Sequence, residues 1–351
     1  MVLALAKEIA LRKSELLDCD RSDNKIETIY FGGGTPSILQ IADIRYLIDE
    51  VYKHYKVIEN PEITVEANPD DLDEETIRQF ANSPINRLSI GIQSFFEDDL
   101  KLMNRAHNSA EAKKCLEIAI KYFDNISIDL IYGIPEMSNE KWLQNIETAL
   151  SFNVPHISSY ALTVEPKTAL HRFIQKGIIP QPDDDVAQEH FHLLVDKLSE
   201  NGFIHYELSN FGKPTYFSKN NSSYWLGKKY IGIGPSAHSY NGVSRSWNVS
   251  NNTQYLKSIS ENQLPSETET LTKTDRYNEY VMTGLRTIWG ISLDRIEQEF
   301  GKSYLDYLNQ QAEKYIEDHL LFVDDNVLRT TKSGKFLSDG IASDLFLLNL
   351  D

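Results

Sequence analysis

Hydrophobic and polar positions along residues 25–163 switch repeatedly between short apolar runs and amphipathic stretches. The short runs predict strands at 25–31, 63–66, 86–90, 126–131 and 156–161. The amphipathic stretches between them predict helices that include 73–81, 97–103, 110–122 and 139–152. Strands that read as near-continuous apolar runs and alternate with helices are typical of a parallel sheet. The fold class is therefore predicted as α/β, with an incomplete parallel (β/α) barrel.

The chain opens on a helical pattern, with no strand before it. Its apolar positions fall near one face of the helix: Val2, Leu5, Ile9 and Leu16. Its basic side chains are expected to face water: Lys7, Arg12 and Lys13. Both charge signs appear too early for a secretory signal, and no run reaches the roughly 18 apolar residues of a membrane span.

Three glycines, residues 32–34, end the first predicted strand. Without Cβ atoms they allow a ligand to approach main-chain N–H and C=O groups. Ser37 is a plausible N-cap for the helix that follows, which places the glycines at the end of a strand, where α/β folds bind ligands. The pattern matches neither the dinucleotide fingerprint nor the phosphate P-loop, and a plain turn between strand and helix is the alternative.

Polar residues follow the other strands of the predicted barrel in the same way. If the strand ends meet on one side, they form a single constellation of Gly33, Gly34, Thr35, Glu66, Asn68, Gln93, Arg105 and Asp129. Each has a structural alternative as a helix cap, a loop bridge or a solvated surface group. Together, the carboxylates, the amide, the guanidinium and the bare backbone could bind a ligand that carries ammonium, carboxylate and ribose hydroxyl groups.

Composition narrows the function classes. The formal net charge is −17, with 52 acidic and 35 basic residues, which argues against a nucleic-acid binder or an anionic-membrane binder. Two cysteines, Cys19 and Cys115, are too few for a disulfide framework or a zinc site. They fit a reducing, cytoplasmic compartment, and each is expected to be a small buried apolar residue.

Beyond the barrel, a predicted helix at 183–201 and a strand at 203–209 precede an aromatic segment at 220–225 and a glycine-rich segment at 230–240. Tyr and Trp beside a His could line the pocket of a flat macrocycle. A β-hairpin packed on the open end of the barrel explains the composition equally well. Tyr224, His238 and His205 are candidate iron ligands if the macrocycle is a haem.

The last part of the chain predicts a small separate domain. Helical patterns at 274–288, 293–300 and 304–319 are followed by a hairpin that turns at Asp325 and Asn326, and by a last helix near 334–346. Three helices and a β-wing suggest a winged-helix-like α+β domain, but its acidic composition favours docking or a lid over DNA binding. The predicted boundaries are 1–212, 213–268 and 269–351.

Five motifs in order resemble the radical S-adenosylmethionine proteins related to oxygen-independent coproporphyrinogen III oxidase, and within that group they are most similar to its haem chaperones. The motifs are GGGTP at 32–36, EANP at 66–69, NRLSIGIQS at 86–94, NRAH at 104–107 and DLIYGIP at 129–135. The resemblance covers essentially the whole chain.

The resemblance implies a site for S-adenosylmethionine. Gly33, Gly34 and Thr35 would contact its methionine end, and Glu66 would hydrogen-bond the same cofactor. Further contacts are implied for Gln93, Arg105 and Asp129. Haem would be a cargo of the segment that contains Tyr224, Trp225 and His238. The haem chaperones read HNxxYW there, and Asn220 stands where their His would be, which puts iron ligation at that position in doubt.

The family's CxxxCxxC motif, which holds a [4Fe–4S] cluster, is missing from this sequence, and the two cysteines do not replace it. Either the chain is shortened at its N-terminus or it is a cluster-less relative, and we expect shortening. Two functions follow. The first is a haem chaperone that binds haem and a haem-accepting protein and carries the cluster when full-length. The alternative is a coproporphyrinogen III oxidase that decarboxylates a porphyrinogen in porphyrin biosynthesis.

Overall fold

A computed structural model of the 351-residue chain describes residues 1–15 and 25–348. Cys19 and Leu16 lie outside the described residues. The chain divides into two compact units. The barrel unit consists of residues 28–41 and 62–218, and the terminal unit consists of residues 1–27, 42–61 and 219–351.

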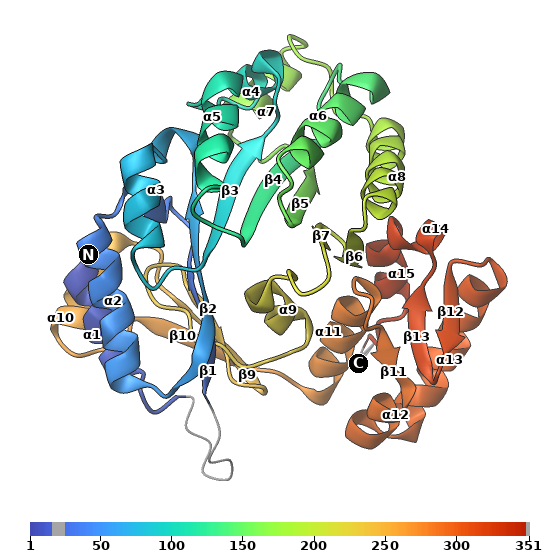
Figure 1. Ribbon diagram of the computed structural model, residues 1–351. Helices are drawn as coiled ribbons and strands as arrows, with labels where there is room; N and C mark the ends of the chain where they lie inside the picture. Colours follow the sequence, from blue (N-terminus) through green and yellow to red (C-terminus); the bar gives the residue numbers. More distant parts are fainter. Residues whose placement is uncertain (16–24, 349–351) are drawn as a thin grey trace. The chain divides into compact units, whose positions relative to one another are not determined.

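The barrel unit is built on a seven-stranded sheet of order β1-β2-β3-β4-β5-β7-β6 within the described residues (Figure 1). The strands are β1 (Ile26–Phe31), β2 (Val57–Ala67), β3 (Arg87–Gln93), β4 (Ile126–Tyr132), β5 (His156–Ala161), β6 (Ile204–Glu207) and β7 (Asn210–Gly212). Strands β2 to β5 pair in parallel, whereas β7 pairs antiparallel with both β5 and β6. The predicted incomplete barrel is confirmed, as a mixed sheet with an antiparallel edge.

Helices lie between the strands of this sheet in chain order. They are α3 (Glu74–Ala81), α4 (Glu97–Leu102), α5 (Ser109–Ala119), α6 (Asn139–Ser151), α7 (Ala169–Gln175) and α8 (Asp184–Glu200), with short 3-10 turns at Pro36–Ile38 and Pro69–Asp71. Asp73 caps α3 by accepting a 2.8 Å bond from the Thr76 N–H. Ser37, in contrast, is not a helix cap, because it lies inside a 3-10 turn and donates to Asp71 Oδ2 at 2.8 Å.

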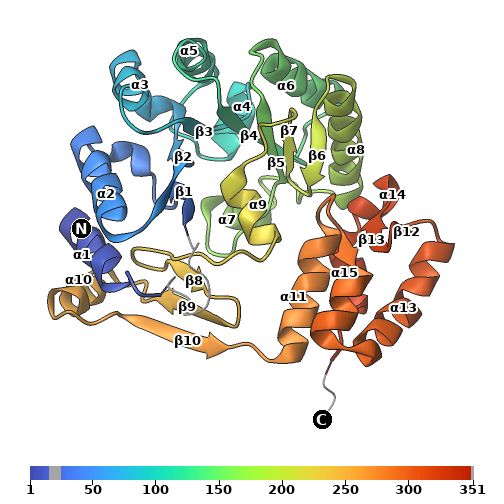
Figure 2. The same cartoon turned by 60° about the horizontal axis from the view of Figure 1, so that its bottom comes forward.

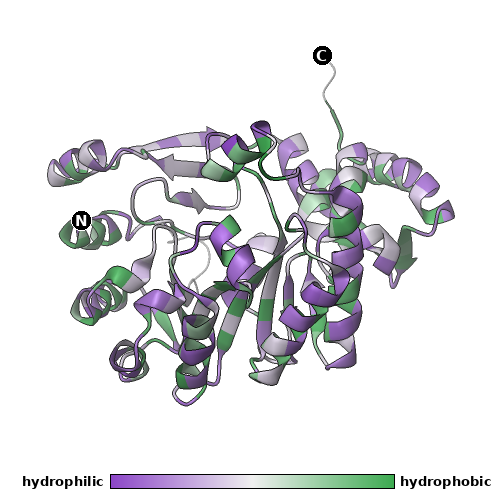
Figure 3. Cartoon of the chain, turned by 90° about the horizontal axis from the view of Figure 1, so that it is seen from above, coloured by the Kyte–Doolittle hydropathy of each residue, from purple (hydrophilic) through white to green (hydrophobic). Residues whose placement is uncertain are grey.

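Apolar and polar residues alternate along the strands of this sheet (Figure 3). The prediction that these strands are near-continuous apolar runs is therefore wrong. Side chains toward the helices are apolar and buried: Val65, Leu88, Ile90, Ile128 and Ile157. Side chains of the opposite register are polar: Thr64, Arg87, Ser89, Ser127, His156 and Ser158. Because successive strand residues point to opposite faces, the inner face of the barrel is polar.

A buried hydrogen-bonded chain joins the parallel strands to the antiparallel edge. His156 contacts Ser127 Oγ at 2.6 Å through Nδ1 and the Tyr206 hydroxyl at 2.7 Å through Nε2. Ser158 Oγ donates to Asn210 Oδ1 at 2.7 Å. Burial holds the pKa of His156 well below its usual value, with Arg87 acting in the same direction, so the imidazole is neutral. The inner face is therefore a largely satisfied polar core in this region.

The terminal unit combines both ends of the described chain (Figure 2). It contains α1 (Val2–Leu11), α2 (Ile41–His54), α9 (Lys219–Trp225), α10 (Asn252–Ser260) and a three-stranded antiparallel sheet of order β10-β9-β8. The strands of that sheet are β8 (His238–Tyr240), β9 (Ser244–Asn248) and β10 (Ser266–Thr270). The aromatic segment predicted as loop or hairpin is thus the helix α9.

The C-terminal region of this unit has its own apolar core, which includes Tyr277, Val281 and Leu328. Its elements are α11 (Lys273–Leu285), β11 (Ile291–Ser292), α12 (Leu293–Arg295), a π-helical turn (Ile296–Phe300), α13 (Lys302–Glu317), β12 (Leu321–Asp324), β13 (Val327–Thr330), α14 (Lys332–Lys335) and α15 (Ser338–Asp344). Asp325 and Asn326 have φ values of 48° and 58°, as a two-residue hairpin turn requires. The predicted small α+β region is confirmed.

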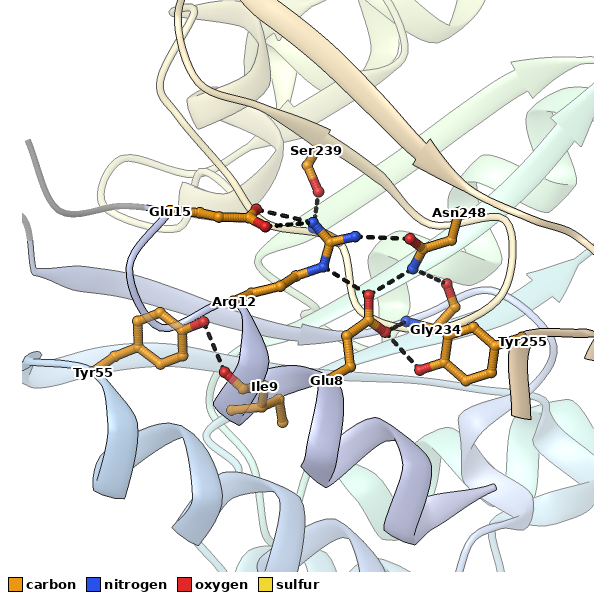
Figure 4. A network of polar contacts seen from close by, with 10 residues as sticks. Glu8, Ile9, Arg12, Glu15, Tyr55, Gly234, Ser239, Asn248 and Tyr255 are labelled. Carbon is orange, nitrogen blue, oxygen red and sulfur yellow. Dashed lines mark hydrogen bonds and ion pairs between the residues drawn. The ribbon is translucent and has the colours of Figure 1, made fainter. Parts of the chain in front are cut away.

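Helix α1 is held by a buried polar network (Figure 4). The Glu8 carboxylate accepts bonds from Arg12 Nε at 2.7 Å, Asn248 Nδ2 at 2.7 Å, the Gly234 N–H at 2.8 Å and the Tyr255 hydroxyl at 2.6 Å. Arg12 is only 2% exposed. The expectation that Arg12 faces water is therefore wrong, because its partner Asn248 lies 236 residues away and no local pattern reveals it.

Across the described ranges, no helix combines the length and the apolar content that crossing a membrane requires.

Candidate functional site

The glycine turn after β1 exposes bare backbone next to a carboxylate. Gly33 has φ 91°, and no heavy atom lies within 4 Å of the position that a Cβ would take at Gly33 or at Gly34. The Gly33 N–H donates to Glu66 Oε2 at 3.0 Å, and the Tyr30 hydroxyl donates to Glu66 Oε1 at 2.6 Å. At Gly32 a Cβ would lie 2.6 Å from the Tyr30 ring, so this position requires glycine. The turn is therefore open to a ligand at Gly33 and Gly34, and contacts with Tyr30 and Glu66 hold it in place.

Thr35 and Gln93 both adopt left-handed backbone conformations at strand ends. Their φ values are 69° and 67°, which is uncommon for residues other than glycine. Asn68 Nδ2 lies 3.4 Å from Thr35 Oγ1. A Cβ at Gly91 would lie 2.8 Å from Gln93 Nε2 and 3.7 Å from Asn68 Oδ1. Strained backbone after β1 and at the end of β3, the strands on either side of β2, is typical of a functional site.

Asp129 on β4 is a half-buried acid that has no ion-pair partner within the described residues. Burial raises its pKa to about 6, the Ser158 hydroxyl opposes this, and the Glu66 carboxylate adds to it. Arg87 and Arg105 lower the pKa of Asp129 at longer range, but no ion pair joins either of them to Asp129 within the described residues. Burial also lowers the pKa of the Arg105 guanidinium, against the pull of Asp129. An acid of this kind is a binding-site candidate.

The structure therefore brings Gly33 and Glu66 into direct contact, and it couples Asp129 to Glu66 and Arg105 through charge. Sequence reasoning missed Tyr30, which donates to Glu66, and Ser158, which lies opposite Asp129 in the strand register and lowers its pKa. Ser158 could have been found, because it repeats at the two-residue spacing of the polar inner face and pairs with Asp129 across β4 and β5.

The cysteines of this chain do not fit a [4Fe–4S] cluster that is held by three cysteine thiolates. Cys115 is buried on α5, and burial raises the pKa of its thiol to about 12, so it is not a thiolate ligand. Cys19 lies outside the described residues, among which no group of three or more His, Cys, Asp or Glu is placed to hold a metal ion. S-adenosylmethionine fits better, because the open glycine backbone and the ionised groups around Asp129 match its polar end.

The terminal unit contains a second candidate, which we call the aromatic cavity. Its volume is about 560 Å³, within the range of small-molecule sites. Its aromatic walls are Tyr224, Trp225, Tyr230, Tyr240, Tyr280, Phe300 and Phe346. Tyr224 meets the edge of Tyr230 at 4.6 Å between ring centroids. The Arg286 guanidinium lies over the Trp225 ring, with its Cζ 5.5 Å from the ring centroid. The rings come from α9, the small sheet and the C-terminal region.

Three arginines line the aromatic cavity. Arg245 pairs with Glu279 at 2.5 Å, and Arg295 pairs with Glu299 at 2.8 Å. Arg276 also lines the cavity, and its Nε is buried without a hydrogen-bond partner within the described residues. A buried guanidinium N–H without an acceptor is costly, so Arg276 is prepared to bind an anionic group.

The other candidate iron ligands lie elsewhere. His238 lines a separate cavity of about 390 Å³, together with Trp247 and Glu267. His205 belongs to the barrel unit, where its Nε2 lies 3.0 Å from the Leu208 carbonyl oxygen and its ring stacks on Phe211 at 4.1 Å. The structure therefore places Tyr224 and Trp225 in one cavity and neither histidine with them.

Known proteins resemble this chain in two regions and over most of its length. The Radical SAM superfamily matches residues 14–155, and the HemN C-terminal domain matches residues 271–337. The chain is 33% identical to a heme chaperone HemW of Lactococcus lactis over 90% of this chain and 84% of the relative. It is also 33% identical to a heme chaperone HemW of Bacillus subtilis, with the same two coverages. Among solved structures, coproporphyrinogen III oxidase (HemN) of Escherichia coli, described as a radical SAM enzyme, has a TM-score of 0.80 at 23% identity. That match covers 98% of this chain and 82% of the other.

Proposed function

The chain belongs to the radical SAM family of the heme chaperone HemW, and from this premise we propose that it is a haem-binding chaperone. The observation that carries the proposal is the aromatic cavity of the terminal unit, which combines ring walls with a guanidinium that lacks an acceptor. A haem is flat and apolar across its macrocycle and carries two carboxylates at one edge. Each part has its complement in this cavity.

The ring walls supply most of the binding free energy in this proposal. Aromatic side chains bury large areas and stack against flat partners, and Tyr hydroxyls keep a polar end for water. Trp225 is held in place because Arg286, which lies over its ring, forms a paired contact with Asp339 at 2.6 and 2.5 Å. A wall that is already ordered loses little entropy when the cargo binds.

Arg276 is the proposed partner of a haem propionate. Unlike Arg245 and Arg295, it has no carboxylate partner within the described residues. A guanidinium can grip a carboxylate with two parallel bonds, which a lysine cannot reproduce. Arg276→Lys should therefore weaken haem binding while iron-free porphyrins with the same propionates show the same loss.

The strand-end cluster of the barrel unit is the proposed site for S-adenosylmethionine. The residues proposed to contact it are Gly33, Gly34, Thr35, Glu66, Gln93, Arg105 and Asp129. The cofactor would be held by backbone groups at the glycine turn and by the Arg105 guanidinium at its carboxylate. Bound to an iron–sulfur cluster, this cofactor supplies radical chemistry in the superfamily, but no such step is assigned to the cysteines of this chain.

Haem titration of the purified chain tests the chaperone proposal. The wild type should give a saturable absorption change at one haem per chain, and Tyr224→Ala combined with Trp225→Ala should weaken binding at least tenfold. Tyr52→Ala is the matched control, because Tyr52 is 48% exposed on α2 while Tyr224 is 45% exposed in the cavity. Equal weakening by the control would contradict the proposal.

The dehydrogenase alternative makes the opposite prediction. It expects release of carbon dioxide from coproporphyrinogen III and consumption of S-adenosylmethionine. Turnover of that kind, together with no saturable haem binding, would replace the chaperone proposal.

A further inference from the structure

The aromatic cavity and the cavity that contains His238 lie over one face of the small sheet. Residues directly opposite each other in an antiparallel sheet share a face. One row across the sheet is His238, Trp247 and Glu267, and all three line the smaller cavity. The second row is Tyr240, Arg245 and Glu269, and all three line the aromatic cavity. Two residues along a strand separate the rows, a distance of about 6.8 Å.

The position of His238 is fixed by its backbone. The Gly232 N–H donates to Ser239 Oγ at 3.0 Å, and a Cβ at Gly232 would lie 2.1 Å from the His238 carbonyl oxygen. The glycine-rich segment therefore packs directly against β8. Ser239 is buried, so its neighbours His238 and Tyr240 both point to the opposite face, over which the two cavities lie.

The His238 imidazole is available to a ligand. The residue is exposed, its ring lies 6.2 Å from that of Trp247, and no hydrogen bond engages it within the described residues. The buried His156 differs, because both of its ring nitrogens have partners. Neutral imidazole with a free nitrogen is the commonest metal ligand among side chains.

The tyrosines of the aromatic cavity are weaker candidates for an iron atom. Burial raises the pKa of both Tyr230 and Tyr240, so each remains a neutral phenol near pH 7. Met282 lines the cavity but also packs against the C-terminal apolar core. Haem iron accepts His, Met, Cys or Tyr. On this face of the sheet the Tyr240 hydroxyl donates to the Gly242 carbonyl oxygen at 3.0 Å, whereas no hydrogen bond engages His238 within the described residues.

We propose that His238 ligates the iron of a haem whose macrocycle lies against Tyr240 and the ring walls of the aromatic cavity. This inference rests on the proposed haem binding and adds the group that recognises the metal. The cargo then spans both rows of the sheet. Its porphyrin is recognised by the aromatic cavity, and its iron is recognised by the row that contains His238.

Paired titrations with haem and with iron-free protoporphyrin IX separate the two roles. His238→Ala should weaken haem binding at least tenfold and shift the Soret band, because iron loses its imidazole. The same variant should bind protoporphyrin IX within twofold of the wild type, because that ligand offers no metal. Added free imidazole should restore the wild-type haem spectrum in His238→Ala.

Two control variants make the outcome specific. His319→Ala removes an imidazole at the end of α13, outside both cavities, and should leave the haem spectrum unchanged. Met282→Leu should also leave it unchanged. A spectral shift in Met282→Leu with none in His238→Ala would overturn the assignment in favour of the thioether.

The failure of this inference differs from the failure of the proposed function. If the wild type binds haem saturably and His238→Ala has the same ferric spectrum and affinity, His238 is not the ligand. If the wild type binds neither haem nor protoporphyrin IX, the chaperone proposal itself is wrong. If His238→Ala weakens the binding of haem and of protoporphyrin IX to the same extent, His238 only packs against the porphyrin, which also contradicts its assignment as the iron ligand.

Discussion

Two polar clusters, one in each unit, use the same chemical groups in opposite ways. In the terminal unit, the Glu8 carboxylate accepts four bonds, which come from Arg12, Asn248, Gly234 and Tyr255. In the barrel unit, Asp129 forms no ion pair within the described residues, and its pKa rises to about 6 although the Ser158 hydroxyl opposes the rise. Burial and charge alone therefore do not identify a site. What distinguishes the barrel cluster is binding capacity that the protein itself leaves unused.

Two arginines of the terminal unit show the same difference between satisfied and unsatisfied polar groups. Arg12 and Arg276 are both arginines of the terminal unit, but Arg12 has a complete set of acceptors, whereas Arg276 Nε has none within the described residues. The first holds a helix, and the second lines a cavity.

Glu8→Ala should destabilise the protein by about 3–5 kcal/mol, because it removes the buried carboxylate that accepts from Arg12 and from three other groups and leaves Arg12 with only the less buried Glu15 as an ionic partner among the described residues. Asp306→Ala is a matched control, since Lys302 and Asp306 form a pair at the same helical spacing but are 74% and 60% exposed. The control should change the free energy of unfolding by no more than about 0.5 kcal/mol. Urea denaturation measures both, and similar losses would mean that the Glu8 network is not a structural core.

Gly33→Val should weaken S-adenosylmethionine binding about a hundredfold, since a branched side chain would stand where the ligand approaches the backbone. Gly177→Val is the matched control in the same unit. Both glycines have positive φ, 91° and 67°, and both lack neighbours near the Cβ position, so the backbone strain is comparable. Calorimetric titration with S-adenosylmethionine should separate them. If both variants bind alike, the glycine turn is only a turn.

Asp129 gives a pH dependence with a defined sign. Its pKa is about 6 in the folded chain and about 3.9 when unfolded, so the folded state binds more protons between pH 4 and pH 6. Its contribution to stability therefore falls as pH rises through that window. Asp129→Asn should remove this slope and raise the free energy of unfolding at pH 7 by roughly 1–2 kcal/mol. Thermal denaturation at several pH values measures it, and a loss of stability at pH 7 would show that Asp129 is fully partnered.

Local patterns predicted the barrel strands and most helices, because each depends on periodicity within about ten residues. The hairpin turn at Asp325 and Asn326 was predicted for the same reason, since the turn chemistry is local. Helix α9 was not predicted, because its sequence is rich in Asn and Ser and is ordered by contacts such as that between Trp225 and Arg286.

The features of the candidate sites also differ in whether a local sequence pattern could predict them. The glycine turn and Glu66 could be predicted, because strand ends in parallel sheets converge. The burial of Arg12 could not, since Asn248 is 236 residues away. Nor could the placement of His238 and Tyr224 in two cavities. Proximity in sequence placed both in one region, but Tyr224 lies on helix α9 and His238 lies on strand β8.

The smallest expected effect concerns Arg105. Arg105→Lys should weaken S-adenosylmethionine binding about tenfold, or roughly 1.4 kcal/mol, because an ammonium cannot reproduce the bidentate grip of a guanidinium on a carboxylate. Arg78→Lys is the control, since Arg78 is an arginine of α3 that is 56% exposed and paired with Glu75. Decarboxylated S-adenosylmethionine sharpens the test, because it lacks the group that Arg105 is proposed to hold. The wild type and Arg105→Lys should bind that analogue equally. If Arg105→Lys also binds the analogue tenfold more weakly, Arg105 acts on Asp129 and the local charge balance. The Arg105 guanidinium would then not be a group of this cluster that binds the carboxylate of the ligand.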